Sequence, residues 1–374
     1  MEKNKKLKKR IIVVLSLIVI AFCNISPSRA IDANLKKDYD LYKKDYMSVD
    51  GRIMDPQREN ATTSEGQAYM LLRSLLMNDK KTFDLVLKWS TNNLQRDDKL
   101  FSWLWGKNKN GEYKIIDANP ASDADIDIAF ALILAHKKWK QKEYLDSARP
   151  IINSIWEKET RQIGDYTVLM PGVEQAKSDN IEINPSYFSP YAFKLFKNYD
   201  KKHDWNKLVN SSYYYLNMAC NNSKIGLPPD WAVIKDGKIS KENINRESFS
   251  YDAIRVFPRV FLDYSTTKDK RAKAILEKSK FFITQWKNTK PPHTLYTNYL
   301  PSGEPKDKNE YLGSIALLLS TINIYDKKVA EEIFKEKLLP KLNEKEYYSN
   351  KNDYYGRNLV WFGYYLYKNF RGLK

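Results

Sequence analysis

Apolar residues recur at the 3.6-residue period of an α-helix along almost the whole of this 374-residue chain. The strict alternation typical of a half-buried strand is scarce, and no Gly/Ser-rich or Pro-rich linker divides the pattern. The chain is therefore predicted to form one all-α domain. The pattern predicts about a dozen helices, over residues 34–48, 65–77, 79–95, 123–137, 141–158, 186–199, 204–220, 248–265, 269–288, 309–323, 327–340 and 353–370.

The connections between these predicted helices alternate in length. Tight turns such as Asn78-Asp79 and Tyr325-Asp326 join some of them. Alternating short and long connections fit a closed double ring of helix hairpins, whose long loops gather at one end and can build a site there. No strong sequence repeat accompanies the hairpins, which disfavours a regular solenoid. The longer connections carry Gly, Pro and aromatic residues and fall at 49–64, 99–121, 160–185, 222–247 and 289–308.

The first 30 residues have the pattern of a secretory signal peptide. A lysine-rich start is followed by the apolar run from Ile11 to Cys23 and by the small-residue site Ser28-Arg-Ala30. The apolar run is short for a membrane span, so a secreted or extracellular protein is predicted, with an uncleaved membrane anchor as the alternative. Residues 31–374 are then expected to form a single domain.

Charge and cysteine content exclude some classes of protein. The net charge is +17, but residues 1–30 contain seven basic residues and one acidic residue, so the rest of the chain carries +11. An anionic cell surface would suit that charge, although solvated helix faces explain it more simply. The chain has no RNP motif, zinc finger or Arg-rich arm, so nucleic-acid binding is not expected. Cys220 is the single cysteine after residue 30, so that part of the chain has no internal disulfide.

Three aspartates stand at the start of an apolar predicted helix, in Ala121-Ser-Asp-Ala-Asp-Ile-Asp-Ile-Ala129. Asp123, Asp125 and Asp127 have the spacing of the first three ligands of a calcium loop, but the Gly and Glu that such a loop needs later are replaced by apolar residues. No metal is therefore predicted. The helix dipole favours acids at this position, yet capping needs only one of them. A polar substrate site and a solvated, capped helix start remain as alternatives.

Aromatic residues make up 13% of the chain, and many lie in the long connections. Trp231 occurs in Pro-Pro-Asp-Trp, and Tyr354-Tyr355 lies near the C-terminus. Aromatic faces beside carboxylates suit sugar rings, whose C–H groups stack while their hydroxyls form hydrogen bonds. Ordinary packing explains a single tryptophan better than sugar binding does. Trp103 and Trp105 together in one predicted loop favour a binding surface.

Two isolated carboxylates have both structural and catalytic interpretations. Glu65 lies in Thr62-Thr-Ser-Glu-Gly-Gln-Ala-Tyr69, where a charge at a helix N-terminus is favourable in itself. Asp252 lies in Ser250-Tyr-Asp-Ala-Ile-Arg255, so Arg255 stands one helical turn away and would favour the ionised carboxylate. An ordinary ion pair explains the second spacing equally well.

Considered together, these segments resemble a known family. Residues 121–139, A-S-D-A-D-I-D-I-A-F-A-L-I-L-A-H-K-K-W, resemble the signature of glycoside hydrolase family 8, which contains bacterial endoglucanases, chitosanases and xylan-active enzymes. The resemblance covers nearly all of the chain after residue 30, with its blocks in the family's order. The other blocks are Gly51-Arg-Ile-Met-Asp-Pro56 with Thr63-Ser-Glu-Gly-Gln-Ala-Tyr69, Asn184-Pro-Ser-Tyr-Phe-Ser-Pro190, Leu227-Pro-Pro-Asp-Trp231 and Ser250-Tyr-Asp-Ala-Ile-Arg255.

This resemblance implies an (α/α)6 barrel with an open cleft and an inverting mechanism that uses no metal or organic cofactor. Glu65 matches the general acid, and Asp252 matches the general base of the subgroup that uses Asp there. Asp123 matches the carboxylate that binds and distorts the sugar, with Asp125 close behind it. Asp127 is assigned a structural role. Burial and a neighbour such as Asp123 are expected to raise the pKa of Glu65.

The remaining candidate residues are expected to bind the glycan. Trp103, Tyr187, Tyr251 and Arg255 map onto cleft positions that stack on or orient the sugar in the family. The aromatic pattern adds three further residues to these candidates. They are Trp105, Tyr354 and Tyr355.

The resulting expectation is a secreted, monomeric endo-β-1,4-glucanase that cuts cellulose or a related β-glucan. The chain has no recognisable cellulose-binding module, dockerin or Ser/Pro linker, and in this it resembles the single-domain members that accompany bacterial cellulose synthases. A cellulose synthase complex is thus an expected partner, in exopolysaccharide or biofilm production. The alternatives are the same fold acting on lichenan, xylan, chitosan or another exopolysaccharide, and a non-catalytic glycan-binding protein. Asp252 argues against chitosan, and the presence of both Glu65 and Asp252 argues against mere binding.

Overall fold

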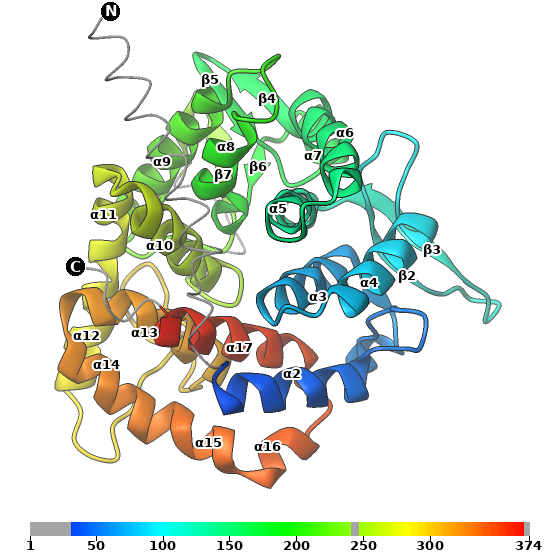
Figure 1. Ribbon diagram of the computed structural model, residues 1–374. Helices are drawn as coiled ribbons and strands as arrows, with labels where there is room; N and C mark the ends of the chain where they lie inside the picture. The colour runs from blue at the N-terminus through cyan, green and yellow to red at the C-terminus, as the bar shows by residue number, and fades with distance from the viewer. Residues whose placement is uncertain (1–30, 241–246, 370–374) are drawn as a thin grey trace, which may run out of the picture.

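The computed structural model describes residues 31–240 and 247–369, and it forms an (α/α)6 barrel, as the resemblance implies. Inner helices surround the centre and outer helical segments enclose them (Figure 1). Each inner helix except the last is joined to the next outer segment by a short turn. The inner helices are α3 (Ser64–Leu76), α5 (Ser122–Trp139), α8 (Pro190–Phe196), α10 (Val256–Thr267), α13 (Leu312–Tyr325) and α17 (Tyr354–Asn369).

The outer ring is less regular than the sequence pattern predicted. The predicted helix 269–288 is split by a 3-10 turn, and 327–340 passes through a π-helical segment, Phe334–Leu338. Pro340 follows that segment and cannot donate the hydrogen bond of a regular helix, which accounts for the widened turn. The outer elements are α2 (Ala33–Tyr46), α4 (Lys80–Asn93), α6 (Lys142–Glu159), α9 (Trp205–Asn221), α11 (Lys270–Leu276) with α12 (Lys280–Lys287), and α14 (Lys327–Ile333) with α15 (Leu339–Asn343).

Two predicted inner helices begin later than expected. The predicted helix 186–199 starts with a 3-10 turn, Pro185–Tyr187, and α8 begins only at Pro190, whose ring suits a first helical position but keeps the preceding residue extended. The predicted helix 248–265 starts with the 3-10 turn Ala253–Arg255 before α10. Two short helices were not predicted, α7 (Val173–Lys177) and α16 (Lys345–Ser349).

Three small antiparallel sheets lie in the long connections, where the sequence pattern predicted loops. Most of these strands have only two to six residues, which is too short for a period to show. The hairpin β2–β3 projects from the barrel (Figure 1). The strands are β1 (Thr62–Thr63), β2 (Ser102–Lys107) and β3 (Tyr113–Pro120); β4 (Thr160–Ile163) and β5 (Tyr166–Leu169); and β6 (Glu182–Ile183), β7 (Ala232–Lys235) and β8 (Lys238–Ile239).

The core lies between the two rings of helices. Every residue of α5 from Ser122 to Ala135 is buried, because this helix has neighbours on all sides. The inner ring closes where α3 meets α17: the rings of Tyr69 and Phe362 lie 5.4 Å apart, and Arg73 Nη1 donates to Asn358 Oδ1 at 3.2 Å. The barrel thus brings residues from both ends of the chain together.

A buried ion-pair network holds the first described helix, α2, against the inner ring. Asp38 of α2 pairs with Arg73 of α3 at 2.8 Å and with Arg357 of α17 at 2.7 Å, and both arginines are fully buried. Arg357 also pairs with Asp45 at 3.1 Å. Removing one partner of such a network leaves an uncompensated buried charge, at a cost of about 3–5 kcal/mol. The network therefore fixes the position of α2 against α3 and α17.

No helix in the described part of the chain is both long and apolar enough to cross a bilayer. The predicted signal peptide, residues 1–30, lies outside the described residues. Cys220 is buried and forms no disulfide there.

Helices α13 and α17 pack unusually closely, since a glycine lies at their contact. A Cβ atom placed on Gly363 would lie 2.2 Å from the carbonyl carbon of Ala316 and 2.5 Å from the backbone nitrogen of Leu317. These are backbone atoms, so no side-chain rotation can make room. Only glycine fits at this position with the two helices at their present distance.

We therefore expect Gly363→Ala to destabilise the protein. Alanine normally stabilises a helix relative to glycine by about 0.5–1 kcal/mol, but overpacking here should cost about 1–3 kcal/mol net. Chemical denaturation would measure the change in the free energy of unfolding. Lys88→Ala, at an exposed position of α4, is the control and should change it by less than about 0.5 kcal/mol. A Gly363→Ala variant as stable as the wild type would contradict the close packing of α13 and α17.

Candidate active site

A cavity of about 360 Å³ opens at the end of the barrel where the inner helices begin. The long connections also meet at this end, as the alternation of loop lengths predicted. Nine of the eleven candidate site residues line the cavity. Those nine are Glu65, Trp103, Asp123, Tyr187, Tyr251, Asp252, Arg255, Tyr354 and Tyr355.

Arg255 is the centre of the cavity's charged groups. Its Nη1 donates to Asp123 Oδ2 at 2.8 Å and also to Glu65 Oε1. Its Nη2 donates to Asp252 Oδ1 at 2.6 Å, which confirms the ion pair predicted from the three-residue spacing. One buried guanidinium therefore holds carboxyl groups from three segments that are far apart in the sequence.

Glu65 combines burial with contact to the cavity. It occupies the first turn of α3, where the Thr63 side chain caps the helix by accepting from the backbone N–H of Gly66 at 3.0 Å. Its side chain keeps 26% of its exposed area, and Tyr69 Oη donates to Oε1 at 2.8 Å. Burial raises the pKa of Glu65 to about 7; Arg255 opposes this rise and Asp123 adds to it. The carboxyl group can therefore carry a proton near neutral pH, as expected.

Asp123 lies deeper than Glu65, with 3% of its surface exposed. Burial raises its pKa, and Arg255 acts in the opposite direction. Asp123 stands in the first turn of α5, where the helix dipole favours a negative charge. Asp123 lines the cavity and accepts a hydrogen bond from Arg255 Nη1, the nitrogen that also donates to Glu65.

Asp252 is the most accessible of the three carboxylates, with 33% of its side chain exposed. Oδ1 accepts from Arg255, and Trp231 Nε1 donates to Oδ2 at 3.0 Å. Asp252 stands just before the 3-10 turn that leads into α10, rather than inside the helix that the sequence pattern predicted.

Asp230 organises the backbone around Asp252 and was not among the predicted site residues. Its Oδ1 accepts from three backbone N–H groups, those of Ser250 at 3.0 Å, Asp252 at 3.1 Å and Ala253 at 2.8 Å. Burial raises the pKa of Asp230 to about 6, although these donors oppose the rise. Its place in the Pro-Pro-Asp-Trp segment was visible in the sequence, but its hydrogen bonds join segments 20 residues apart.

Asp125 does not line the cavity and lies fully buried behind it. Its Oδ1 accepts from the backbone N–H of Phe101 at 2.8 Å, which ties α5 to the start of the β2–β3 hairpin. The Glu159 carboxyl, also fully buried, lies within hydrogen-bonding reach, and burial raises both pKa values well above their usual range. No N–H or hydroxyl group of the described residues donates to Glu159. Burial therefore favours the protonated form of both carboxyl groups.

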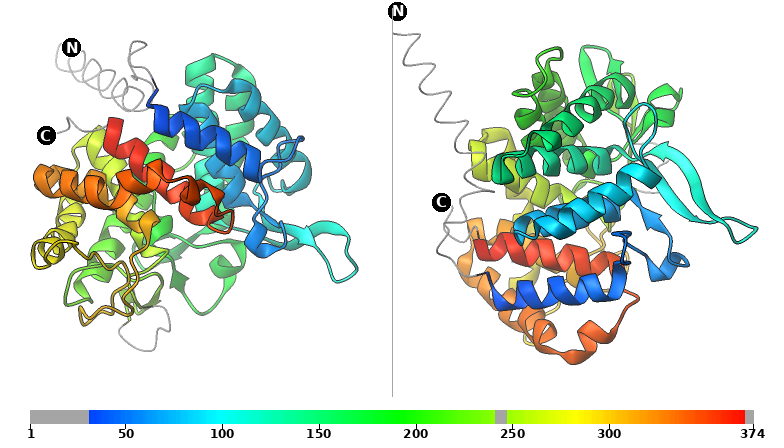
Figure 2. Two further views of the ribbon diagram at one scale, coloured as in Figure 1. Left: turned by 90° about the horizontal axis from the view of Figure 1, so that it is seen from below. Right: turned by 45° about the vertical axis from the view of Figure 1, so that its right-hand side comes forward.

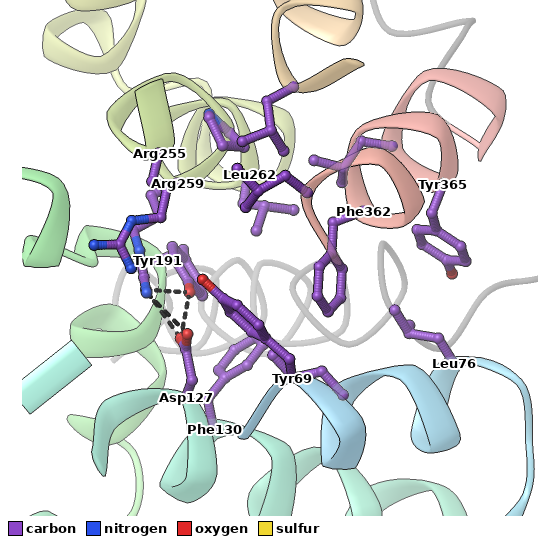
Figure 3. Close-up of a pocket in the computed structure, with 15 residues that line it drawn as sticks. Tyr69, Leu76, Asp127, Phe130, Tyr191, Arg255, Arg259, Leu262, Phe362 and Tyr365 are labelled. Carbon is purple, nitrogen blue, oxygen red and sulfur yellow. Dashed lines mark hydrogen bonds and ion pairs between the residues drawn. The ribbon is translucent and has the colours of Figure 1, made fainter. Parts of the chain in front are cut away.

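Asp127 belongs to a structural cluster below the cavity. It pairs with Arg259 of α10 at 2.8 and 2.9 Å, and Tyr191 Oη donates to it at 3.1 Å. Figure 3 shows this cluster beside a small apolar cavity of about 90 Å³ on the barrel axis. The three aspartates thus have three different sets of partners and do not converge. In the described part of the chain, no group of three or more His, Cys, Asp or Glu is arranged to hold a metal ion.

Trp103 and Trp105 are separated by a local irregularity in β2. Residues two apart in a strand normally share a face, but the β2–β3 register shifts on either side of Leu104. Trp103 lines the cavity, with Arg58 above its ring at 5.7 Å. Trp105 instead packs against Trp89 and lies under the Arg52 guanidinium, 4.3 Å from its ring centroid. The structure therefore does not bring Trp105 to the cavity.

The four candidate tyrosines occupy different parts of the cavity wall. Tyr251 is 43% exposed at the rim, and Tyr355 Oη donates to its backbone oxygen at 3.2 Å. The ring of Tyr187 lies 5.5 Å from the Arg255 guanidinium carbon. Tyr354 is only 5% exposed and packs against Tyr42 and Tyr46, so it supports the cavity wall and offers little surface to a ligand.

Other residues that line the cavity or contact its carboxyl groups were missed because nothing in their local pattern marks a functional role. Tyr69 looks like an ordinary helix residue, and its bond to Glu65 depends on their four-residue spacing. Asp55 caps the short helix η1 (Pro56–Arg58) by accepting from the N–H of Gln57 at 3.0 Å, and it lines the cavity together with Arg58. The capping pattern could have located Asp55, but not its place beside the cavity.

Comparisons with known proteins agree with this architecture. The endoglucanase of Escherichia coli K12 is 33% identical over 226 residues, which is 59% of this chain and 60% of that protein. Endoglucanase A of Acetivibrio thermocellus is 29% identical over 343 residues, 88% of this chain and 68% of that protein. The match to E. coli thus spans less than two thirds of that relative's length.

A solved structure gives a similar result over a greater length. The endo-1,4-D-glucanase of Vibrio fischeri ES114 superposes with a TM-score of 0.76 at 28% identity, covering 89% of this chain and 94% of that one. The family model described as glycosyl hydrolases family 8 matches residues 9–367. The chain therefore belongs to glycoside hydrolase family 8.

Proposed function

We propose that this protein is an exported endo-β-1,4-glucanase that hydrolyses cellulose or a related β-glucan with inversion of configuration. The observation that carries the proposal is the set of three carboxyl groups on Arg255, in a cavity with an aromatic rim. The endoglucanase names of the relatives support the choice of substrate. A protein that only binds glycans would not need a buried carboxyl group whose pKa is raised to about 7.

In the proposed reaction Glu65 is the general acid. Its protonated carboxyl donates a proton to the glycosidic oxygen as the bond between that oxygen and the anomeric carbon breaks. Asp252 is the general base: it removes a proton from a water molecule, whose oxygen attacks the anomeric carbon from the opposite face. Inverting enzymes hold these groups about 6.5–9.5 Å apart to leave room for the water. Glu65 and Asp252 bond to different nitrogens of the Arg255 guanidinium, so both carboxyl groups border the same part of the cavity.

Asp123 is proposed to hold and distort the sugar at the cleavage point. It is buried beneath Arg255 and faces the cavity, so a sugar hydroxyl could replace part of its bonding to the guanidinium. Trp103 and Tyr251 offer aromatic surface on which adjacent sugars can stack.

Residues 1–30 are proposed to export the protein as a signal peptide, and the catalytic domain is proposed to act as a monomer on extracellular polymer. We further propose a role beside a bacterial cellulose synthase in exopolysaccharide production. Deleting the gene in its host and measuring the amount and length of secreted β-glucan would test this role, and unchanged polymer would contradict it.

Substitution of the two proton-transfer residues should abolish polymer hydrolysis. We expect Glu65→Gln and Asp252→Asn each to lower kcat/KM on carboxymethylcellulose by at least about a hundredfold, the usual contribution of general acid–base catalysis. Lichenan, xylan and chitosan assayed alongside would define the substrate. No cleavage of any of the four by the wild type would contradict the proposal.

An activated substrate separates the two roles. A dinitrophenyl β-glycoside has a leaving group that needs no protonation, so Glu65→Gln should keep most of its activity on it, whereas Asp252→Asn should remain inactive. NMR of the first product should show the α-anomer. An initial β-anomer would contradict inversion, and equal activity of the two variants on the activated substrate would contradict the assignment of roles.

The pH dependence should report the raised pKa of Glu65. The acid must be protonated, so kcat/KM should fall as the pH rises through about 7. Tyr69 donates to Glu65 and so favours the ionised carboxylate; Tyr69→Phe should raise the pKa of Glu65 and move this basic limb to higher pH. A pH–rate profile of both proteins on soluble substrate would measure the shift. A limb that moves to lower pH would contradict the role of Tyr69.

Asp230 should act by positioning Asp252 rather than by its charge. Asp230→Ala removes the acceptor of three backbone N–H groups, and misplacement of the base should lower kcat/KM about a hundredfold. Asp230→Asn keeps an amide oxygen at that place and should retain most of the activity. If the Asn variant is as impaired as the Ala variant, the charge of Asp230 matters and the positioning role is wrong.

A further inference from the structure

The end of the barrel opposite the cavity is formed by five short turns that join inner to outer helices. These turns follow the C-terminal ends of α3, α5, α8, α10 and α13, whose N-terminal ends face the cavity side. We call this surface the turn face. It comprises residues 77–81, 136–143, 197–207, 267–273 and 324–328.

Contacts between neighbouring turns make the turn face continuous. Lys138 Nζ donates to the backbone oxygen of Leu75 at 2.7 Å, and Lys137 lies 5.6 Å from the ring centroid of Tyr199. Arg271 donates to Asn210 of α9 at 2.8 Å. Tyr325 Oη donates to the backbone oxygen of Lys273 at 3.2 Å, which joins the last two turns. The five turns therefore lie side by side around one end of the barrel.

The turn face holds almost all of the net charge of the chain after residue 30. Its 36 residues contain 16 Lys or Arg and 6 Asp or Glu, a net charge of +10, whereas residues 31–374 together carry +11. The four longer connections that supply cavity residues, 48–63, 94–121, 160–189 and 222–255, contain 15 basic and 16 acidic residues. The charge is thus concentrated at one end rather than spread over solvated helix faces.

Local helix stability accounts for only part of this concentration: Lys80, Lys142 and Lys328 pair with acidic residues one helical turn on, Asp84, Asp146 and Glu332. Lysines at the C-terminal ends of the inner helices complement the helix dipole, but several basic residues stand in the first turns of the outer helices, where a positive charge is unfavourable. Helices α4, α9, α11 and α14 have no acidic residue in the first turn. Basic residues occupy it instead: Lys80, Lys81, Lys207, Lys270, Arg271, Lys327 and Lys328.

The described chain also starts at the turn face. Asp32 caps α2 and accepts from Tyr364 Oη at 3.0 Å, and it pairs with Lys368 at 3.2 Å, both near the C-terminal end of α17. Tyr355, near the other end of the 16-residue α17, lines the cavity, and such a helix is about 24 Å long. In both views of Figure 2 the start of α2 lies away from the β2–β3 hairpin. The apolar run Ile11 to Cys23 precedes this point in the sequence.

We propose that the turn face docks on an anionic phospholipid bilayer. Clustered lysines bind acidic headgroups electrostatically, and the first described residues, which follow the proposed signal peptide in the sequence, lie on the same side of the barrel. The cavity then faces away from the membrane, where a polysaccharide chain can enter it. This role goes beyond the hydrolysis of glucan and does not depend on it.

Two matched variants of the full chain test the proposal. The turn variant carries K81E, K142E, K207E, K270E and K327E, all exposed and one in each turn. The control variant carries K109E, K114E, K177E, K224E and K238E, also exposed, in the connections at the cavity end. Both change the net charge equally and share residues 1–30. The turn variant should fold about as stably as the wild type, because the favourable position of each new acid in the helix dipole offsets the loss of the Lys142–Asp146 pair.

Binding would be measured by sedimentation with phosphatidylglycerol–phosphatidylcholine vesicles and with pure phosphatidylcholine vesicles, at low and high salt. We expect the wild type and the control variant to prefer the anionic vesicles, with affinity falling as salt rises. The turn variant should bind them at least about tenfold more weakly. Thermal unfolding and hydrolysis of soluble glucan should be unchanged in both variants.

Other outcomes would overturn the proposal. Equal weakening in both variants would mean that net charge alone acts, and unchanged binding of the turn variant would place the contact elsewhere. Equal binding of the wild type to both vesicle types would exclude headgroup recognition. Binding of the wild type to soluble polyphosphate but not to anionic vesicles would assign the turn face to an anionic polymer instead of a membrane.

Discussion

The arrangement of the candidate site depends on one buried guanidinium. Arg255 holds Glu65, Asp123 and Asp252 on two adjacent nitrogens, in a cavity too covered for water to screen three negative charges. One positive charge cannot balance three ionised carboxylates at low dielectric. Burial above all, with Asp123 and Asp252 in addition, raises the pKa of Glu65 although Arg255 opposes the rise, so this carboxyl group can keep a proton near neutral pH. Ion pairing and the supply of a catalytic proton are therefore two consequences of the same geometry.

The barrel makes this geometry possible because of the direction of its inner helices. The N-terminal ends of α3, α5 and α10 all point toward the cavity, and each end carries a partial positive charge. Glu65 and Asp123 stand in first turns, where that charge helps to stabilise them. Asp252 lies outside a helix, and it is placed instead by Asp230, which accepts from the backbone N–H groups of Ser250, Asp252 and Ala253. Helix ends position two of the carboxyl groups, and a side-chain anchor positions the third.

The sequence could predict whatever has a local cause, such as the helical period, the turn at Asn78 or the ion pair between Asp252 and Arg255. It could not predict contacts between distant segments, such as the bonds of Asp230 to residues 20 and more positions away or the burial of Glu159 beside Asp125. Trp105 shows a third limit: two tryptophans in one predicted loop were expected to act together, but the segment is a strand whose register shifts around Leu104, and only Trp103 reaches the cavity. Motif resemblance located Glu65, Asp123 and Asp252 because it carries non-local information that periodicity lacks.

The same helix direction gives the two ends of the barrel opposite electrostatic character. At the cavity end, inner-helix N-termini support acids, and the connections there have nearly balanced charge. At the turn face, inner-helix C-termini support lysines, but the outer helices begin there and would favour acids in their first turns. Four of those helices are capped by an aspartate, as the helix dipole favours, but the first turn that follows each cap contains basic and no acidic residues. The capping residues are Asp79, Asp204, Asp269 and Asp326. Basic residues stand in the dipole-disfavoured first turns of several outer helices. Such a repeated departure from helix preference indicates selection for binding to something else, which a negatively charged surface would supply.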